Sequence, residues 1–446
     1  MKQTARIIST YSADVMGVCS ALFELGGMTI MHDASGCNST YTTHDEPRWY
    51  DMDSMVYISG ISEMEAIMGD DEKLIGDICD AAENLHPEFI AIAGTPIPTM
   101  TGFDFEAVAE VVEQRTGIPS FGFPTTGMNT YIHGASMALA GIAKRFVLPR
   151  EEALAANAPA EAASSAEAAS PAEAASSAEA ASPETAGFRV NILGLTPLDF
   201  SINGTDQSIR KWLEGNGFEV ISTWAMGCSL DDIRRSSLAD VNLVVSAAGL
   251  GAADVLYDRF GIPYIVGLPI GEEPEKESPK VFLANMLRRY AEKKRAADRG
   301  EGSALETKSM TIRTDVSRTA LSESAAAGES AAAKGTVAII GEPVISLALS
   351  TAIEVATGMN TKVLCATEPM NVMLRPKDRV TPDEDDIIPE LEDAAIIIAD
   401  PLYRPICPAE AKFISLPSEA FSGRIFREDI PDLVADFGGW FRNATL

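Results

Sequence analysis

The stretch from residue 28 to residue 50 concentrates side chains that could do chemistry. A short apolar run (28–31) is followed by a Gly-containing turn that ends at Cys37. Beyond the turn come several hydroxyls, His44, two acidic residues, an arginine and a tryptophan. In open α/β sheets ligands bind at the rim where strands end, and loops on a rigid scaffold often carry function. The pattern therefore predicts a functional loop at the edge of a sheet.

Cys19 and Cys37 flank this apolar run, and their thiols suggest metal chemistry. Iron–sulfur clusters take cysteine thiolates, normally four. Both cysteines lie at predicted turns near one sheet edge, so their side chains can converge. One chain would supply two ligands, and two copies related by a two-fold axis would supply four. The alternative is a pair of buried free thiols, because cysteine packs as a small apolar residue. The residues alone favour this alternative.

These same residues resemble the opening of nitrogenase component 1 proteins. That superfamily includes the molybdenum–iron protein subunits, cofactor scaffold proteins, the dark protochlorophyllide reductase and the reductive cyclase of coenzyme F430 synthesis. In it, a Cys after a Gly and a second Cys ending an HGPxGC-like turn ligate an iron–sulfur cluster at a subunit interface. The matching segments here are Gly17-Val18-Cys19 and HDASGC at 32–37. The resemblance implies that Cys19 and Cys37 bind a cluster of the [4Fe–4S] type shared between two chains.

Two departures from the family pattern limit what the resemblance implies. Thr95-Pro96 stands where the family has Cys-Pro, so a third cysteine ligand is absent at that position. Ser246, Ala247 and Ala248 fill the turn where nitrogenase has the cysteine that holds the iron–molybdenum cofactor. A standard nitrogenase cofactor bound in the usual way is therefore not expected.

A glycine-rich turn supplies the catalytic candidates. In the family such a turn carries polar residues, including a histidine, on the cofactor side. Here the turn places Asn129, Thr130 and His133 as candidates to face the same cleft. For His133, a helix residue with a satisfied hydrogen bond is an equally favoured interpretation. Cys79 has a core-facing helical spacing, and the remaining three cysteines match no ligand position of the family.

The composition divides the chain into segments of similar pattern. Residues 159–170 read PAEAASSAEAAS, and the next twelve residues repeat them. Such a tract has no bulky apolar side chain to bury and is typical of a linker. A second low-complexity tract lies at 322–335. We therefore expect domains at 1–150, 187–300 and 335–446, joined by linkers at 151–186 and 301–334.

Each expected domain alternates short apolar runs with amphipathic ones, which is the βαβ pattern. FIAIAG (89–94), VNLVVSAAG (241–249) and AAIIIADP (394–401) are apolar without alternation, which indicates strands covered on both faces. The predicted fold is three doubly wound, Rossmann-like α/β domains with mainly parallel sheets around a central cleft, as the resemblance also implies. Neither GxGxxG nor GxxxxGK[ST] is complete, so the chain itself is not predicted to bind ATP.

Charge and hydropathy narrow the class of partner. The formal net charge of −30 argues against binding to nucleic acid or an anionic membrane. There is no run of 18 apolar residues and no apolar signal core near the first residue, so we expect a cytoplasmic protein without a membrane span. The six scattered cysteines do not form a disulfide framework.

The resemblance implies the catalytic component of a nitrogenase-like two-component reductase. Its partners would be a second copy or a homologous sister subunit, and a separate ATP-dependent iron–sulfur reductase that delivers electrons. A cluster would pass those electrons to a substrate in the interdomain cleft. Two other functions stay open: a scaffold that carries a metallocluster or a metal tetrapyrrole, and a plain ligand-binding α/β protein.

Overall fold

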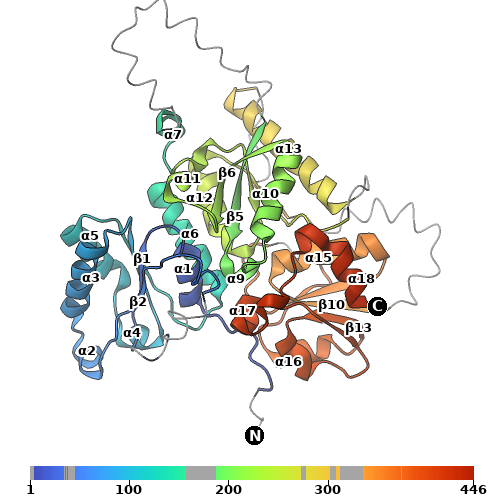
Figure 1. Cartoon of the computed structure of the whole chain (residues 1–446), viewed down its shortest axis with the longest axis horizontal. Helices are drawn as coiled ribbons and strands as arrows, with labels where there is room; N and C mark the ends of the chain where they lie inside the picture. The colour runs from blue at the N-terminus through green and yellow to red at the C-terminus, as the bar shows by residue number, and fades with distance from the viewer. Residues whose placement is uncertain are drawn as a thin grey trace, which may run out of the picture.

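Three parallel sheets organise the molecule. The computed structural model describes residues 5–34, 36, 38, 46–156, 187–272, 278–301, 308–311, 335–372 and 374–445. Among these residues, sheets of four, five and five strands occur, and every pairing between strands is parallel. Each sheet carries its own helices, and the three units meet at the centre of the molecule (Figure 1). The prediction of three doubly wound α/β domains is confirmed. The repeat tract at 159–182 lies outside the described residues.

In the first domain, alternate residues of a strand pack into two hydrophobic cores, one on each face of the sheet. In its central strand, Ile90 and Ile92 belong to the core beneath two long helices, while Ala91 and Ala93 face the other side. The small alanines let a second pair of helices approach that face closely. Its strands, in the order β2-β1-β3-β4, and helices are β1 (Met28–Met31), β2 (Val56–Ile58), β3 (Ile90–Ala93), β4 (Ser120–Phe123), α1 (Asp14–Leu22), α2 (Glu63–Met68), α3 (Asp71–Leu85), α4 (Pro96–Thr101), α5 (Phe105–Thr116), α6 (Tyr131–Phe146) and α7 (Arg150–Ala156).

The second domain extends beyond its expected end. The strand Ser309–Thr311 pairs with the strand Tyr264–Val266, so residues within the expected linker at 301–334 belong to this sheet. The strand order is β6-β5-β7-β8-β9. Its elements are β5 (Phe188–Leu195), β6 (Phe218–Ala225), β7 (Val241–Val244), β8 (Tyr264–Val266), β9 (Ser309–Thr311), α9 (Pro197–Phe200), α10 (Thr205–Gly215), α11 (Leu230–Arg234), η2 (Ser236–Leu238), η3 (Ala247–Gly249), α12 (Leu250–Phe260) and α13 (Pro279–Asp298).

The third domain has the strand order β12-β11-β10-β13-β14. Its elements are β10 (Thr336–Gly341), β11 (Asn360–Cys365), β12 (Arg379–Val380), β13 (Ala394–Ala399), β14 (Lys412–Ser415), α15 (Pro343–Thr357), α16 (Glu384–Glu390), η6 (Pro401–Ile406), α17 (Glu419–Ser422), η7 (Gly423–Asp429) and α18 (Leu433–Thr445).

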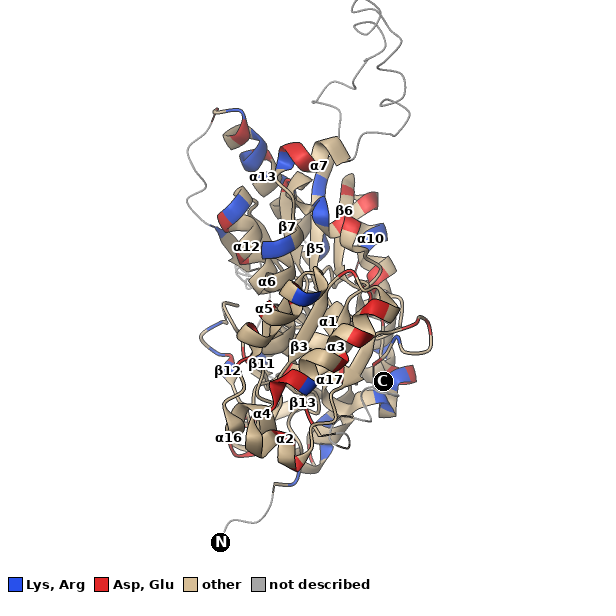
Figure 2. Cartoon of the chain, turned by 90° about the vertical axis from the view of Figure 1, so that its left-hand side faces the viewer, with Lys and Arg blue, Asp and Glu red and all other residues tan. Residues whose placement is uncertain are grey.

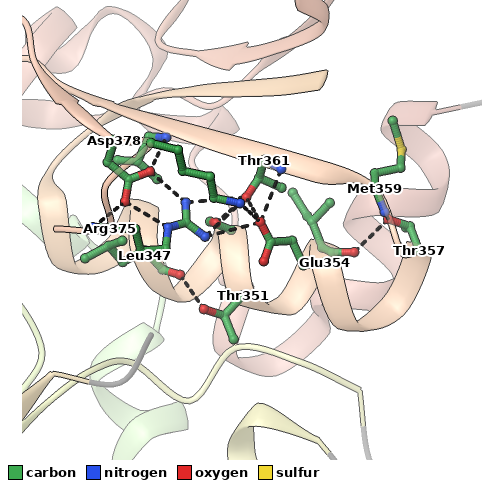
Figure 3. A network of polar contacts seen from close by, with 12 residues as sticks. Leu347, Thr351, Glu354, Thr357, Met359, Thr361, Arg375 and Asp378 are labelled. Atoms are coloured by element: carbon green, nitrogen blue, oxygen red, sulfur yellow. Dashed lines mark hydrogen bonds and ion pairs between the residues drawn. The ribbon is translucent and has the colours of Figure 1, made fainter. Parts of the chain in front are cut away.

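A buried ion-pair network ties a loop of the third domain to its core (Figure 3). The Arg375 guanidinium donates to both carboxylate oxygens of Asp378 at 2.8 Å and to Glu354 Oε1 at 3.2 Å. Asp378 also accepts the Val363 amide at 2.9 Å, which anchors the network to β11. All three charged side chains are buried, so each depends on its partners.

The sheet topology fixes where functional side chains can gather. In each domain the strand order reverses beside the first strand, between β1 and β3, β5 and β7, and β10 and β13. Ligands of open α/β sheets bind at the carboxyl ends of the strands at such points. The residues that follow these strands are therefore the first place to look for a site.

The N-terminal segment and two helices join the domains. Before α1 the chain crosses the third domain, where the Tyr11 and Ser12 amides both donate to the Ala420 carbonyl, at 3.1 and 3.0 Å. Helix α6 packs against α1 and also against α12 of the second domain. One large hydrophobic core accordingly runs through all three domains.

Acidic and basic residues are spread along the chain, and basic residues are frequent around α12 and α13 at one end of the molecule (Figure 2). In the part of the chain that the structure describes, no helix is long and apolar enough to span a membrane.

Candidate functional site

The turn after β1 is braced from inside the first domain. His32 Nδ1 lies 2.8 Å from Ser59 Oγ, and burial lowers the pKa of His32 to about 4. Its ring is therefore neutral near pH 7 and serves to orient the turn. The Asp33 carboxylate accepts the Ala34 amide at 2.8 Å and the Asn38 side-chain amide at 2.6 Å. These bonds hold the start of the loop that contains Cys37.

Cys19 lies in helix α1 rather than at a turn, which corrects the sequence-based placement. Helix α1 touches α6 so closely that a Cβ on Gly17 would lie 1.9 Å from the Tyr131 carbonyl oxygen. This contact buries Cys19 completely. Burial, and then the negative charge of Glu46, raise the pKa of the Cys19 thiol. Glu46, which is described again after residues 39–45, therefore lies near Cys19.

Cys37 itself lies outside the described residues, as do residues 39–45. The described residues around it show what surrounds the turn. Cys19 shares a core cluster with the last residues of β1 and β3. Thr95, at the position where the family has a third cysteine, donates its hydroxyl to the His32 carbonyl at 3.0 Å. The turn and Thr95 are therefore joined at the carboxyl edge of the first sheet, and Cys19 belongs to the large core that includes the ends of β1 and β3.

The described residues supply part of a metal site. None of their His, Cys, Asp or Glu side chains form a group of three or more that could hold a metal ion. Cys19 offers one thiolate donor, and the Thr95 hydroxyl is already engaged in the turn. A metal ion bound here would have to displace the proton of the Cys19 thiol, and its positive charge would balance the nearby Glu46 charge. A cluster at this place fits the residues only if Cys37 and another chain contribute.

The remaining described cysteines are occupied elsewhere. Cys79 packs half-buried against the core beneath α3 and α5. The Cys228 and Cys407 thiols donate to backbone carbonyls at 3.3 Å, and burial raises the pKa of Cys228 to about 12 and of Cys407 to about 11. Cys365 is buried at the end of β11.

The three catalytic candidates prove to have different surroundings. Asn129 donates its side-chain amide to the buried carboxylate of Asp14 at 3.0 Å, and the same carboxylate accepts the Gly127 amide at 2.8 Å. Asn129 thus braces its own turn. Thr130 donates both its amide and its hydroxyl to Glu368 of the third domain. His133 is half-buried on α6, one turn further on.

A cavity of about 490 Å³ separates the first and third domains. Asn129 and Thr130 line it, and His133 does not. The opposite wall comes from the N-terminal segment and from the residues that follow β11. The structure therefore brings two of the three candidates to an interdomain cavity, although their side chains already have partners in the protein.

A hydrogen-bonded cluster connects all three domains through residues that follow β4, β5, β7 and β10. Asp199, after β5, accepts the hydroxyls of Tyr131, Thr196 and Ser246, the last two at 2.8 and 2.6 Å. Tyr131 comes from the first domain. Ser246 belongs to the turn that the sequence resemblance matched to the cofactor-binding turn of nitrogenase, and its hydroxyl donates to Asp199.

Glu342, after β10, faces the same junction from the third domain. Its carboxylate accepts the Ala247 amide at 2.8 Å and the Ile345 amide at 2.7 Å. Burial, and then the Asp199 charge, raise the pKa of Glu342 to about 8; burial also raises the pKa of Asp199. Both acids line a small cavity of about 70 Å³ between the second and third domains, together with Asp400. Burial and the repulsion between the two carboxylates therefore favour the protonated form of Glu342 near neutral pH.

Sequence reasoning missed Asp199, Glu342 and Glu368. Each is an acid directly after an apolar parallel strand, or within a few residues of its end, and that placement is the signal that could have identified it.

Comparisons with known proteins agree with this architecture. A profile of the family described as nitrogenase component 1 type oxidoreductases matches residues 14–394. One component of the light-independent protochlorophyllide reductase of Prosthecochloris aestuarii is 36% identical over 100 residues, which are 22% of this chain and 18% of that protein. The nitrogenase iron-molybdenum cofactor biosynthesis protein NifE of Methanosarcina barkeri is 26% identical over 215 residues, which are 47% and 40% of the two chains.

Among solved structures, nitrogenase Cp1 at pH 6.5 superposes with a TM-score of 0.62 and 14% identity, over 100% of this chain and 94% of that one. This similarity shows the fold. The sequence matches to the two curated relatives span less than half of their lengths. Because the family profile covers most of the chain and the fold agrees over its whole length, this chain belongs to the nitrogenase component 1 type oxidoreductase family.

Proposed function

We propose that the chain is the catalytic component of a nitrogenase-like two-component reductase. The observation that supports this proposal is the complete burial of Cys19, in a Gly-x-Cys helix, in the core that also contains the last residue of β1, the strand that precedes Cys37 in the sequence. In a dimer of two copies, or with a sister subunit, Cys19 and Cys37 of both chains would supply four thiolates for an iron–sulfur cluster. Such a cluster would supply single electrons at a low potential.

The residues of this chain have defined parts in the proposal. Burial of Cys19 among apolar side chains excludes water from the thiolate, which favours a low-potential site. Neutral His32 and the Asp33 carboxylate hold the turn that leads to Cys37. A substrate would bind in the 490 Å³ cavity, where Asn129 and Thr130 keep the wall in place through Asp14 and Glu368. The buried acids Asp199 and Glu342 would hold a proton for the reduction.

Electron delivery tests this proposal directly. The protein is purified without oxygen and mixed with its cognate ATP-dependent iron–sulfur reductase, and the visible absorbance of the cluster is followed. We expect a spectral change that requires both the reductase and ATP, and no such change in Cys19→Ser. A cluster-loaded protein whose spectrum does not respond would contradict a catalytic role.

A scaffold function is the second candidate, and one observation favours it. The match to NifE, which is named as a cofactor biosynthesis protein, extends over 47% of this chain, against 22% for the protochlorophyllide reductase component. A scaffold would release its bound metallocluster or metal tetrapyrrole to an acceptor protein without turnover. Transfer of radiolabelled iron to such an acceptor would separate the scaffold from the reductase.

A further inference from the structure

A pocket of about 100 Å³, here called the first-domain pocket, lies where the strand order of the first sheet reverses. It is lined by His32 directly after β1, by Ser59 directly after β2 and by Phe103 shortly after α4. Helices α2 and α4 contact each other at this end of the domain (Figure 1). Open α/β sheets commonly bind ligands in a crevice at such a point. The proposed reductase and scaffold functions do not use this pocket.

The hydrogen bonds around His32 determine which ring nitrogen carries the proton. The Ser59 hydroxyl donates to the Asp33 carbonyl at 3.3 Å, so its hydrogen is already used. In the 2.8 Å contact between His32 Nδ1 and Ser59 Oγ, the proton therefore belongs to Nδ1. Burial lowers the pKa of His32 to about 4, so the ring is neutral near pH 7. Nε2 accordingly has a lone pair and acts as a hydrogen-bond acceptor.

Nε2 of His32 is open to the first-domain pocket. His32 is only 4% exposed, and Nε2 has no hydrogen-bond partner among the described residues. Nε2 is also not one of the unpartnered buried atoms of the described residues that a water molecule cannot reach, so the pocket gives access to it. The Phe103 ring packs against the imidazole with the ring centroids 4.4 Å apart, which fixes the orientation of the acceptor. Such a preorganised acceptor favours a ligand that brings a donor.

The charge of the pocket favours a cation. Its charged lining residues are four acids and one base, namely Glu65, Asp70, Asp71, Asp77 and Lys73. Lys73 forms ion pairs with Glu65 at 3.2 Å and with Asp77 at 3.5 Å. Asp70 and Asp71 have no basic partner among the described residues. Burial, and then the neighbouring acidic charges, raise the pKa of Asp71. A positive charge in the pocket would relieve this repulsion, and an anion would increase it.

A metal ion fits these residues less well than an organic cation does. Among the described residues, no group of three or more His, Cys, Asp or Glu side chains could hold a metal ion. An organic cation needs only an acceptor for its N–H groups and nearby negative charge. Both are present, because Nε2 of His32 is the acceptor and the acids of the pocket supply the charge.

We propose that the first-domain pocket binds a small organic cation that donates an N–H group to His32 Nε2 and balances the charges of Asp70 and Asp71. Small ammonium, amidinium and guanidinium ions belong to this class. Carboxylates, phosphates and cations without N–H groups do not. The site goes beyond the proposed function, because it requires neither the cluster nor the reductase.

The test uses the purified full chain and four small probes: acetamidinium, acetamide, acetate and tetramethylammonium. The first three have nearly the same shape and differ in charge and in N–H groups, and the fourth is a cation without N–H groups. Binding is measured near pH 7 by ligand-observed NMR titration. We expect acetamidinium to bind about tenfold more tightly than acetamide, because charge-assisted hydrogen bonds are about twice as strong as neutral ones. Acetate and tetramethylammonium should also bind more weakly than acetamidinium.

Two substitutions of His32 separate the nitrogen that binds the ligand from the nitrogen that holds the turn. His32→Asn keeps an amide near the position of Nδ1 and has no atom at the position of Nε2. It should retain the bond to Ser59 and weaken acetamidinium binding about tenfold. His32→Gln places an amide oxygen near the position of Nε2, so it should bind acetamidinium more tightly than His32→Asn does. Asp71→Asn removes one charge and should weaken binding about threefold.

Glu72→Gln is the matched control. Glu72 lies in the first turn of α3 beside Asp71, but it does not line the pocket and pairs with Arg115 at 2.9 Å. This substitution should leave acetamidinium binding unchanged. Because a ligand that binds only the folded protein stabilises it, acetamidinium should raise the melting temperature of wild type and Glu72→Gln more than that of His32→Asn.

Four results would overturn the proposal: no binding of acetamidinium, acetate or tetramethylammonium binding as tightly as acetamidinium, full affinity in His32→Asn, or full affinity in Asp71→Asn. If His32→Asn does not fold, the series of probes and Asp71→Asn still decide the question. The titration involves neither electrons nor iron. A failure of electron delivery would therefore leave this result intact, and a failure of probe binding would leave the proposed function intact.

Discussion

Glu342 provides a test of the three-domain junction, because its buried surroundings determine whether stability rises or falls with pH. Burial and the Asp199 charge raise its pKa from 4.5 to about 8. An acid whose pKa is higher in the folded protein binds its proton more tightly there than in the unfolded chain. Below about pH 4.5 the acid is protonated in both the folded and the unfolded chain, so it does not reduce stability. As the pH rises from there towards 8, the unfolded chain loses this proton while the folded protein keeps it, and the free energy of unfolding falls. The full span corresponds to a loss of about 5 kcal/mol, as an upper limit.

The perturbation is Glu342→Gln, which keeps the side-chain volume and removes the titration. Urea unfolding midpoints of wild type and variant are compared at each pH between about 5 and about 9, because multi-domain chains seldom unfold in one step. We expect the wild-type midpoint to fall clearly over this range and the variant midpoint to fall much less. Glu106→Gln, an exposed replacement on α5, should follow the wild-type curve.

Asp199→Asn adds a second arm to the same experiment. Removing the Asp199 charge should bring the pKa of Glu342 closer to its ordinary value, so the pH dependence should shrink without vanishing. If Glu342→Gln instead loses stability with pH as steeply as wild type, Glu342 holds no proton in the folded protein, and the reasoning from burial is refuted.

Further predictions concern packing, ion pairs and metal content. Arg375→Ala should lower the free energy of unfolding by about 3–5 kcal/mol, because it strands buried carboxylates, whereas Arg379→Ala at the surface should change it by less than about 1 kcal/mol; equal losses in urea unfolding would contradict this. Gly17→Ala should cost about 1–3 kcal/mol, because its Cβ would meet the α6 backbone, whereas Gly76→Ala on α3 meets open space and should stabilise the chain. Elemental analysis should find no stoichiometric molybdenum, because the Ser246 hydroxyl already donates to Asp199. Stoichiometric molybdenum would contradict our account of the three-domain junction.

Local sequence pattern was sufficient to predict the fold because the central strands are short and mainly apolar. FIAIAG and VNLVVSAAG indicated strands covered on both faces, and both are central strands of parallel sheets. The short strand Ser309–Thr311 escaped prediction, because its three residues gain their apolar neighbours only by pairing with β8. Short edge strands depend on tertiary contacts more than on their own sequence.

The candidate site was less predictable than the fold, because the residues that contact one another there are far apart in the chain. The sequence indicated Asn129 as a catalytic candidate. In the structure its side chain donates to Asp14, 115 residues earlier in the chain, so its role is structural. Asp199 and Glu342 each look ordinary in sequence, and only the junction of three sheets brings them together. Cys19 and Cys37 could be selected from a local motif, since both lie within the short stretch of chain around β1.

Iron content of the purified dimer tests the central claim most directly. If Cys19 and Cys37 of two chains hold one [4Fe–4S] cluster, anaerobic protein should contain about four iron atoms per two chains. Cys19→Ser and Cys37→Ser should each lose most of the iron and the visible absorbance, because symmetry removes two thiolates at once. Cys79→Ser should retain both. Full iron in Cys37→Ser, or in an isolated monomer, would contradict a cluster shared between two chains.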